Sequence, residues 1–94
     1  MAGTLTEAQI TSQLDGLAGW SRQGDEIRKT FQCAGFPAAI AFVTQVGFLA
    51  EAAAHHPDID IRWQNVTLAL TTHDAGGLSQ KDFDLARQID TLVG

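Results

Sequence analysis

The sequence predicts an α+β domain in which three helices pack on one face of a four-stranded antiparallel sheet, in the order α-β-β-α-β-β-α. Two segments have the strand–turn–strand pattern of a β-hairpin. Three other segments repeat apolar residues at helical spacing, and they lie before, between and after the hairpins. Hairpins joined by a helix form an antiparallel sheet whose helices cover one face. Ninety-four residues hold one hydrophobic core, so residues 1–94 are expected to form a single domain.

Composition and charge exclude several classes of protein. The formal net charge is −5 and no run of Lys and Arg occurs, which argues against nucleic-acid binding as the main activity. The one cysteine, Cys33, cannot form an intrachain disulfide, which fits a reducing, cytoplasmic location. The first ten residues lack the basic and apolar regions of a signal peptide. The uncharged stretch 33–50 contains Pro37 and is short for a membrane span, so we expect a buried or interface helix there.

The first helix is expected to begin at Thr6 and to be short and amphipathic. Thr6 can cap the helix, and Gln9 can reach back to complete a capping box. One apolar stripe follows at helical spacing: Ile10, Leu14, Leu17. The segments 20–23 and 27–33 are predicted as two short strands around a Gly24-Asp25 turn.

The segment Phe36–Ala54 is predicted as the longest helix. Pro37 suits the first turn, where its missing N–H costs nothing. Apolar residues cover more than half of the circumference, so we expect burial on two sides, the second against a partner subunit. Pro57 disfavours the α conformation at the residue before it and stops the helix nearby. The helix is expected to place Glu51 and His55, four residues apart, on one face.

The segment Ile59–Thr72 is predicted as a hairpin with Gln64-Asn65 as its two-residue turn. All the resulting pairs are apolar and share one face: Trp63 with Val66, Ile61 with Leu68, Ile59 with Leu70. Trp63 is therefore expected in the core. If the second strand continues, its alternation places His73 on the opposite, polar face.

The last helix is predicted to follow a turn at Gly76-Gly77. Ser79 and Asp82 have the spacing of a second capping box, and Leu78 can contact Phe83. The buried stripe of this helix is expected to contain five apolar residues: Leu85, Ala86, Ile89, Leu92 and Val93.

All three histidines lie between Glu51 and Asp82, and three interpretations compete for this stretch. In the first, each residue has a structural role, as Asp82 has in its capping box. In the second, Glu51, His55 and His73 bind a metal. Adjacent histidines at 55 and 56 point apart on regular backbone and no HExxH motif is present, so we expect no metal.

In the third interpretation the histidines perform acid–base chemistry. Histidine titrates nearest to neutral pH, so one imidazole can donate a proton while another accepts one. No serine or cysteine stands beside them in the sequence as a nucleophile. Elimination of water or an isomerisation therefore fits this set of residues better than acyl transfer.

The same stretch resembles the pterin-4a-carbinolamine dehydratases, also called 4a-hydroxytetrahydrobiopterin dehydratases. The matching residues, at matching spacings, are Glu51-x-x-x-His55-His56-Pro57, Trp63, Thr72-His73, Gly77-Leu78-Ser79 and Asp82. The resemblance implies loss of water from a 4a-hydroxytetrahydropterin to give quinonoid dihydropterin, which recycles the cofactor of aromatic amino-acid hydroxylases. It also implies homo-oligomers, either dimers or tetramers, and no metal or organic cofactor.

The resemblance also implies roles for individual residues. His55 and His73 would carry the proton transfers, with acid and base undecided between them, and Asp82 would orient a histidine in addition to capping its helix. Six further residues are expected at the substrate: His56, Pro57, Thr72, Asp74, Glu51 and Trp63. His56 would hold the pterin and Glu51 would tune the site, whereas for Trp63 the core position is favoured over stacking on the pterin. The alternative is a non-catalytic interaction module that pairs through the long helix.

Overall fold

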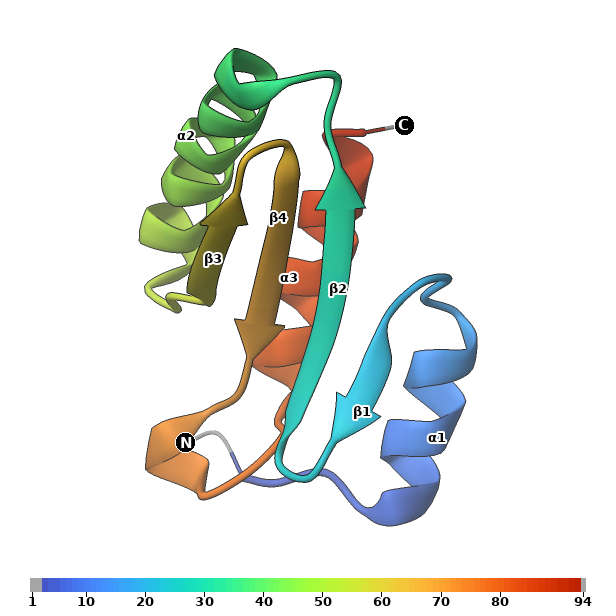
Figure 1. Cartoon of the computed structure of the whole chain (residues 1–94). Helices are drawn as coiled ribbons and strands as arrows, with labels where there is room; N and C mark the ends of the chain where they lie inside the picture. The colour runs from blue at the N-terminus through green and yellow to red at the C-terminus, as the bar shows by residue number, and fades with distance from the viewer. Residues whose placement is uncertain (1–2, 94) are drawn as a thin grey trace.

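The computed structural model describes residues 3–93 and contains the predicted elements in the predicted order (Figure 1). The helices are α1 (Glu7–Asp15), α2 (Phe36–Ala53) and α3 (Gln80–Thr91), and a short 3-10 helix, η1, covers His73–Ala75. The strands are β1 (Ser21–Gln23), β2 (Glu26–Gln32), β3 (Asp58–Arg62) and β4 (Asn65–Leu70). They form an antiparallel sheet in the order β1-β2-β4-β3, with β2 and β4 at its centre.

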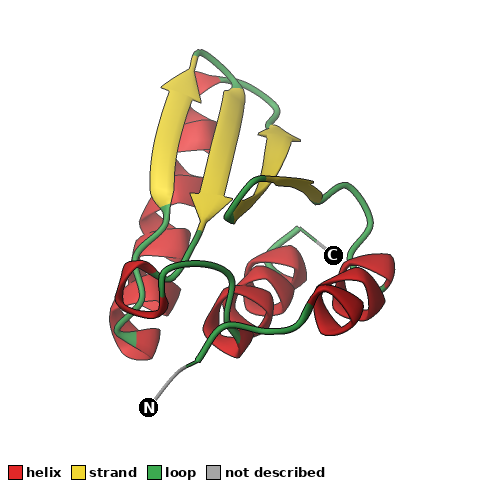
Figure 2. Cartoon of the chain, turned by 90° about the horizontal axis from the view of Figure 1, so that it is seen from below, coloured by secondary structure: helices red, strands yellow, loops and turns green. Residues whose placement is uncertain are grey.

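The core lies between one face of this sheet and the three helices. Alternate residues of the central strands are buried on that face, where Ile27 pairs with Leu70 and Phe31 pairs with Val66. The same buried cluster contains residues of every helix, including Ile10 of α1, Val46 of α2 and Phe83 of α3. Figure 2 shows the helices gathered on one side of the strands. The predicted α+β fold is therefore confirmed.

The predicted capping box at the start of α1 is present. The Thr6 side chain accepts a hydrogen bond from the Gln9 backbone N–H, and the Gln9 side chain accepts one from the Thr6 N–H, at 3.2 and 2.8 Å. Arg22 of β1 makes two hydrogen bonds to Glu7, which tie α1 to the sheet edge. These hydrogen bonds, then the Arg22 charge, lower the pKa of Glu7 below its ordinary value of 4.5. The Glu7–Arg22 pair therefore stabilises the fold at pH values above 4.5. This stabilisation is lost as the pH falls through the lowered pKa of Glu7.

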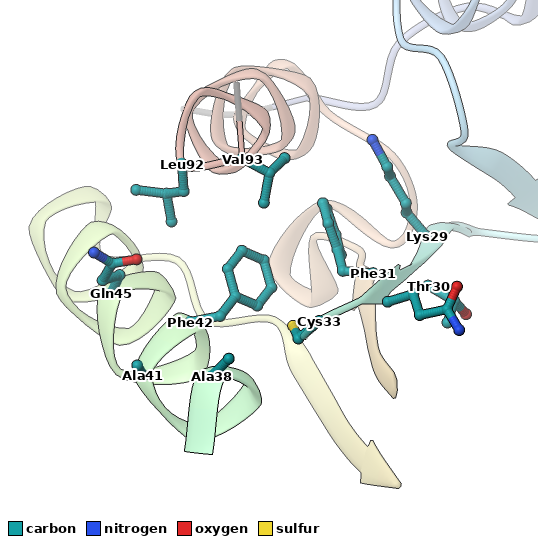
Figure 3. A pocket seen from close by; sticks show the side chains of 11 residues that line it. Lys29, Thr30, Phe31, Cys33, Ala38, Ala41, Phe42, Gln45, Leu92 and Val93 are labelled. Carbon is teal, nitrogen blue, oxygen red and sulfur yellow. The ribbon is translucent and has the colours of Figure 1, made fainter. Parts of the chain in front are cut away.

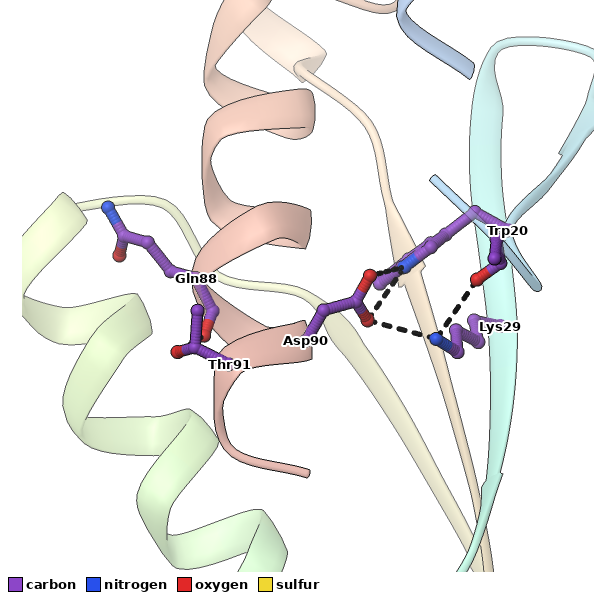
Figure 4. A network of polar contacts seen from close by, with 6 residues as sticks. Trp20, Lys29, Gln88, Asp90 and Thr91 are labelled. Atoms are coloured by element: carbon purple, nitrogen blue, oxygen red, sulfur yellow. Dashed lines mark hydrogen bonds and ion pairs between the residues drawn. The ribbon is translucent and has the colours of Figure 1, made fainter. Parts of the chain in front are cut away.

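The end of α3 is fixed to the sheet by a second polar network (Figure 4). The Asp90 carboxylate accepts hydrogen bonds from Trp20 Nε1, 3.1 Å from each oxygen, and from Lys29 Nζ at 3.0 Å. Lys29 Nζ also donates to the carbonyl oxygen of Ala18 at 3.1 Å. One carboxylate thus holds together α3, β2 and the segment between α1 and β1.

Replacing Asp90 by alanine is expected to lower the free energy of unfolding by about 1–2 kcal/mol, because the Trp20 N–H and the Lys29 ammonium both lose an acceptor. Urea denaturation followed by tryptophan fluorescence measures this change. Asp84→Ala removes an exposed carboxylate from the same helix and is the matched control. Equal stabilities of the two variants would show that the network contributes nothing.

The second hairpin differs from the prediction in its register. Its turn is Trp63-Gln64, because Arg62 pairs with Asn65, Ile61 with Val66 and Ile59 with Leu68. This pairing is shifted by two residues, so Ile59 and Ile61 keep their predicted face while Trp63 leaves the ladder. Trp63 adopts a left-handed turn conformation (φ 54°) and is 69% exposed. Its predicted position in the core is wrong.

Helix α2 ends earlier than the spacing argument assumed. Its C-cap, Ala54, is left-handed (φ 52°), so the backbone has already turned away from the helix axis before residue 55. The expected placement of Glu51 and His55 on one helical face is therefore wrong. Glu51 Oε1 instead lies 3.0 Å from His56 Nε2.

Only one side of α2 is built into the core. Four residues at helical spacing are buried on it: Ala39, Phe42, Val46 and Ala50. The outer side exposes Phe36, Ile40 and Phe48, so its predicted burial would require a partner subunit. By length and composition alone the helix could cross a membrane. Its packing against α3 and β4 accounts for the apolar inner side without one.

The last helix has the predicted capping box between Ser79 and Asp82. Leu78 and Phe83, which flank it, are both buried. The predicted buried stripe extends two residues past the helix, because α3 ends at Thr91. Leu92 is its half-buried C-cap and Val93 is 57% exposed. The preceding strand also ends before His73, which therefore lies on η1 and not on the polar face of a strand.

Candidate active site

His55 is placed by the end of α2. Its backbone N–H donates to the carbonyl oxygen of Ala50 at 3.0 Å, which closes the last turn of the helix. The left-handed Ala54 then directs the next side chain toward the start of α3. There His55 Nε2 lies 2.6 Å from Asp82 Oδ1, and only 11% of the imidazole is exposed.

The Asp82 carboxylate is fully buried behind His55. Its Oδ2 accepts hydrogen bonds from the Ser79 backbone N–H and from the Thr72 hydroxyl, each at 2.9 Å. Burying a carboxylate is costly unless its lone pairs are occupied, and here protein donors approach both oxygens. Asp82 therefore has two structural functions at once, because it caps α3 and holds the His55 ring.

His73 comes from a loop that is fixed at both ends. The backbones of Thr72 and Gly77 form an antiparallel bridge, and between them η1 ends at Gly76, which is left-handed (φ 76°). The Thr71 hydroxyl also donates to the carbonyl oxygen of Asp25 at 2.5 Å, which ties this loop to the turn between β1 and β2. The His73 side chain is thus exposed on a loop with few alternative conformations.

The segment that follows α2 and the loop that follows β4 meet at a cavity of about 250 Å³. Its lining comes from the end of α2, the loop after β4 and the start of α3: Ala54, His55, His56, Thr71, Thr72, His73, Asp74 and Lys81. His55 and His73 therefore line one pocket, which is open to solvent. A second cavity of about 320 Å³ shares Thr71 and His73 with the first and adds Gln23, Asp25 and Glu26.

The remaining predicted site residues lie outside this cavity. Glu51 is beside it and contacts His56, whose imidazole is largely exposed. Pro57 follows His56 and is half-buried, and it directs the chain into β3. Trp63 lies at the turn between β3 and β4, at the opposite end of these strands from His73 (Figure 1). Trp63 therefore does not contribute to the cavity of its own chain.

Two polar cavity residues, Thr71 and Lys81, were not predicted from the sequence. Lys81 stands between the two members of the Ser79–Asp82 capping box, so its place near the mouth of the cavity follows from that motif. Thr71 comes directly before the predicted Thr72-His73 pair. Both positions add polar groups beside the histidines.

A larger cavity, about 500 Å³, lies elsewhere (Figure 3). It is formed by the end of β2, one side of α2 and the last residues of the chain, with Phe31, Phe42, Leu92 and Val93 among its lining. It is mainly apolar and contains no histidine. Within residues 3–93, no group of three or more His, Cys, Asp or Glu side chains is placed to hold a metal ion.

Comparison with known proteins identifies the family. The sequence model described as pterin 4 alpha carbinolamine dehydratase matches residues 3–92. The chain belongs to this family. A relative from Roseiflexus sp. (strain RS-1), provisionally named a pterin-4-alpha-carbinolamine dehydratase, is 69% identical over 99% of this chain and 100% of its own length. A relative of the same provisional name from Thermosynechococcus vestitus is 49% identical over 99% of this chain and 98% of its own.

Solved structures agree with membership of the pterin dehydratase family. A transcriptional coactivator/pterin dehydratase from Brucella melitensis superposes with a TM-score of 0.94 at 29% identity, covering 98% of this chain and 100% of the other. A pterin dehydratase-like protein described as a RuBisCO assembly factor in the alpha-carboxysome superposes with a TM-score of 0.65 at 21% identity. It covers 80% of this chain and 87% of its own, and it shows a shared fold alone.

Proposed function

We propose that the protein catalyses the dehydration of a 4a-hydroxytetrahydropterin to a quinonoid dihydropterin and water, as a hydro-lyase of the family to which it belongs. The observation that carries the proposal is that His55 and His73, from two different loops, line one cavity. The buried Asp82 carboxylate holds the His55 ring from behind. This arrangement supplies two imidazoles to one bound molecule.

The reaction needs two proton transfers and no change in oxidation state. The C4a–O bond breaks and the hydroxyl leaves as water, which requires a proton on the departing oxygen. The N5–H bond breaks as the C4a=N5 double bond forms, which requires a proton acceptor. One imidazole donates the first proton and the other accepts the second, each contributing on the order of a hundredfold or more. Because the substrate supplies all the electrons, the reaction as written uses no metal or organic cofactor.

The other residues in and beside the cavity would bind the substrate or hold the histidines under this proposal. His56 is exposed beside His55 and contacts Glu51, so it can hold the pterin while Glu51 tunes its orientation. Thr72 and Asp74 lie on either side of His73, and Pro57 directs the chain after His56 away from the cavity. The product fits recycling of the pterin used by an aromatic amino-acid hydroxylase, and the one free cysteine is consistent with a cytoplasmic location.

A direct assay tests the proposal. The 4a-hydroxytetrahydropterin is generated in the cuvette by an aromatic amino-acid hydroxylase, and formation of quinonoid dihydropterin is followed by absorbance. We expect purified protein at a small fraction of the substrate concentration to accelerate this step. Free imidazole at the same total histidine concentration is the control, because it measures unorganised acid–base catalysis. A rate no higher than that of the imidazole control rules out the proposed function.

We further propose that the active protein is a homo-oligomer, a dimer or a tetramer, in which a second copy covers the outer side of α2. That side exposes Phe36, Ile40 and Phe48, the last to 74%. Strand β3 is also a sheet edge, and its own residue Ile59 is exposed. Exposed apolar residues gathered on one helix mark interaction surfaces in soluble proteins. Pairing through this helix is equally the basis of the non-catalytic alternative.

Replacing Phe48 by glutamate is expected to shift the protein to monomers, because association would bury the new carboxylate against apolar side chains. Light scattering coupled to size-exclusion chromatography measures the molar mass. Gln88→Glu adds the same charge to an exposed position on α3 and should leave the mass unchanged. A monomeric wild-type protein at micromolar concentration contradicts this part of the proposal.

A further inference from the structure

Two buried hydroxyls lie behind the Asp82 carboxylate. Thr72 Oγ1 is 2.9 Å from Asp82 Oδ2 and 2.6 Å from Ser79 Oγ. Thr72 is only 4% exposed, and Ser79 and Asp82 are 0% exposed. The capping box requires Ser79 and Asp82 but makes no use of a threonine hydroxyl. The Thr72 hydroxyl therefore has a position that capping does not explain.

The hydrogens of this group can be placed by counting donors. A hydroxyl has one hydrogen to donate, and a carboxylate has none. The Thr72 hydroxyl must direct its hydrogen to Asp82 Oδ2 if the 2.9 Å contact is a hydrogen bond. Ser79 must then donate to Thr72 across their 2.6 Å contact. The hydrogen bonds consequently run in one direction, from Ser79 through Thr72 to Asp82.

This direction of the hydrogen bonds determines which Asp82 oxygen accepts a hydrogen bond from His55. With two donors at Oδ2, the other oxygen is left for His55 Nε2, 2.6 Å away. Because the carboxylate only accepts, Nε2 carries the hydrogen in neutral His55, and the lone pair lies on Nδ1. No protein group within residues 3–93 bonds Nδ1, and Nδ1 is not among the buried atoms that lack a partner. Nδ1 is therefore not buried, and it belongs to a side chain that lines the cavity.

We infer that Thr72 is a positioning residue, which orients the Asp82 carboxylate and so keeps neutral His55 in its Nε2-protonated tautomer. Every proton that His55 exchanges with a bound molecule then passes through Nδ1. Thr72 also links the two histidines, because its backbone pairs with Gly77 and fixes the loop that carries His73. The kinetic consequence rests on the proposed function, whereas the tautomer is a property of the ligand-free protein.

Long-range proton–nitrogen NMR spectra of protein labelled with ¹⁵N in histidine test the inference, since the two ring nitrogens give different shifts in each tautomer. We expect wild-type His55 as the Nε2-protonated tautomer alone. Thr72→Val keeps the side-chain shape and removes the hydroxyl that holds Oδ2. The carboxylate can then turn away from His55 Nε2, and without that fixed acceptor both tautomers should be observed. We expect kcat for dehydration to fall about tenfold, the equivalent of one hydrogen bond to a charged group, with KM within about twofold of wild type.

Two further variants complete the comparison. Thr72→Ser restores a hydroxyl and should recover the single tautomer and most of the lost rate. Thr67→Val is the matched control, because it removes the partner of the Thr30 hydroxyl, 2.8 Å away on the open face of the sheet. It should leave the His55 spectrum and kcat unchanged. Thr72→Ala replaces Thr72→Val if the valine variant does not fold.

The outcomes separate the inference from the proposed function. A wild-type spectrum with the hydrogen of His55 on Nδ1 overturns the inference, whatever the variants do. The inference is also overturned if the His55 tautomer populations in Thr72→Val differ from wild type no more than those in Thr67→Val do. A tautomer change in a protein without dehydratase activity supports the positioning role and rejects the proposed reaction.

Discussion

Replacing His55 or His73 by alanine is expected to lower kcat for dehydration by about a hundredfold or more in each case, because each variant loses one of the two proton transfers. The effect should appear mainly in kcat, since neither imidazole is the principal binding group under the proposed mechanism. The cuvette assay with hydroxylase-generated substrate measures both constants. The double variant should lose less than the product of the single losses, because the two groups act on one transition state.

His56→Ala is the matched control for these variants. His56 is adjacent in sequence and lines the same cavity, but it is exposed, and its side chain contacts the exposed Glu51. We expect its replacement to raise KM several-fold while kcat stays within a few-fold of wild type. If His56→Ala lowers kcat as much as His55→Ala does, the assignment of proton transfer to His55 is wrong.

Features set by neighbouring residues were predictable from the sequence. The capping boxes at Thr6 and Ser79 depend on residues three positions apart, so a short pattern contains all the participants. The Gly24-Asp25 turn likewise follows from local residue types, and the structure pairs Gln23 with Glu26 across it. The predicted order of elements follows from such local signals together with the packing rule for hairpins joined by a helix.

The hairpin register was not predictable from alternation alone. Side chains on a strand alternate with a period of two residues, so turns at 64–65 and at 63–64 both leave Ile59 and Ile61 on the core-facing side of the sheet. The two alternatives differ in the position of Trp63. The structure places Trp63 in the turn, and the next residue, Gln64, accepts a hydrogen bond from the Cys33 N–H at 2.8 Å. That contact joins residues 31 positions apart in the sequence, so no local pattern predicts it.

The geometry around His55 was missed for a related reason. The spacing of Glu51 and His55 predicts one face only if the helix continues to residue 55, and a left-handed alanine at 54 has no sequence signature. This turn of the backbone directs His55 toward Asp82 and leaves Glu51 to His56. The spacing argument paired Glu51 with His55, whereas the structure pairs each of them with a different residue.

Asp82→Asn is expected to lower kcat by roughly 10² to 10⁴-fold while the protein stays folded. The Ser79 N–H and the Thr72 hydroxyl both require an acceptor, so the amide oxygen should occupy the Oδ2 position. The amide NH₂ then faces His55 Nε2, which must become the acceptor, and the hydrogen moves to Nδ1. The same exchange in the aspartate–histidine pair of serine proteases costs about 10⁴-fold in kcat through the wrong tautomer.

This variant separates the two functions that Asp82 combines. The amide keeps an oxygen for the cap, so we expect the free energy of unfolding to fall by only about 1–3 kcal/mol in urea denaturation. Thr6→Ala, which removes the corresponding cap from α1, should cost about 1 kcal/mol and leave kcat unchanged. If Asp82→Asn behaves like Thr6→Ala in both measurements, Asp82 only caps a helix. A large loss of kcat at a similar cost in stability instead assigns it to the orientation of His55, because a cap alone has no means of changing the rate.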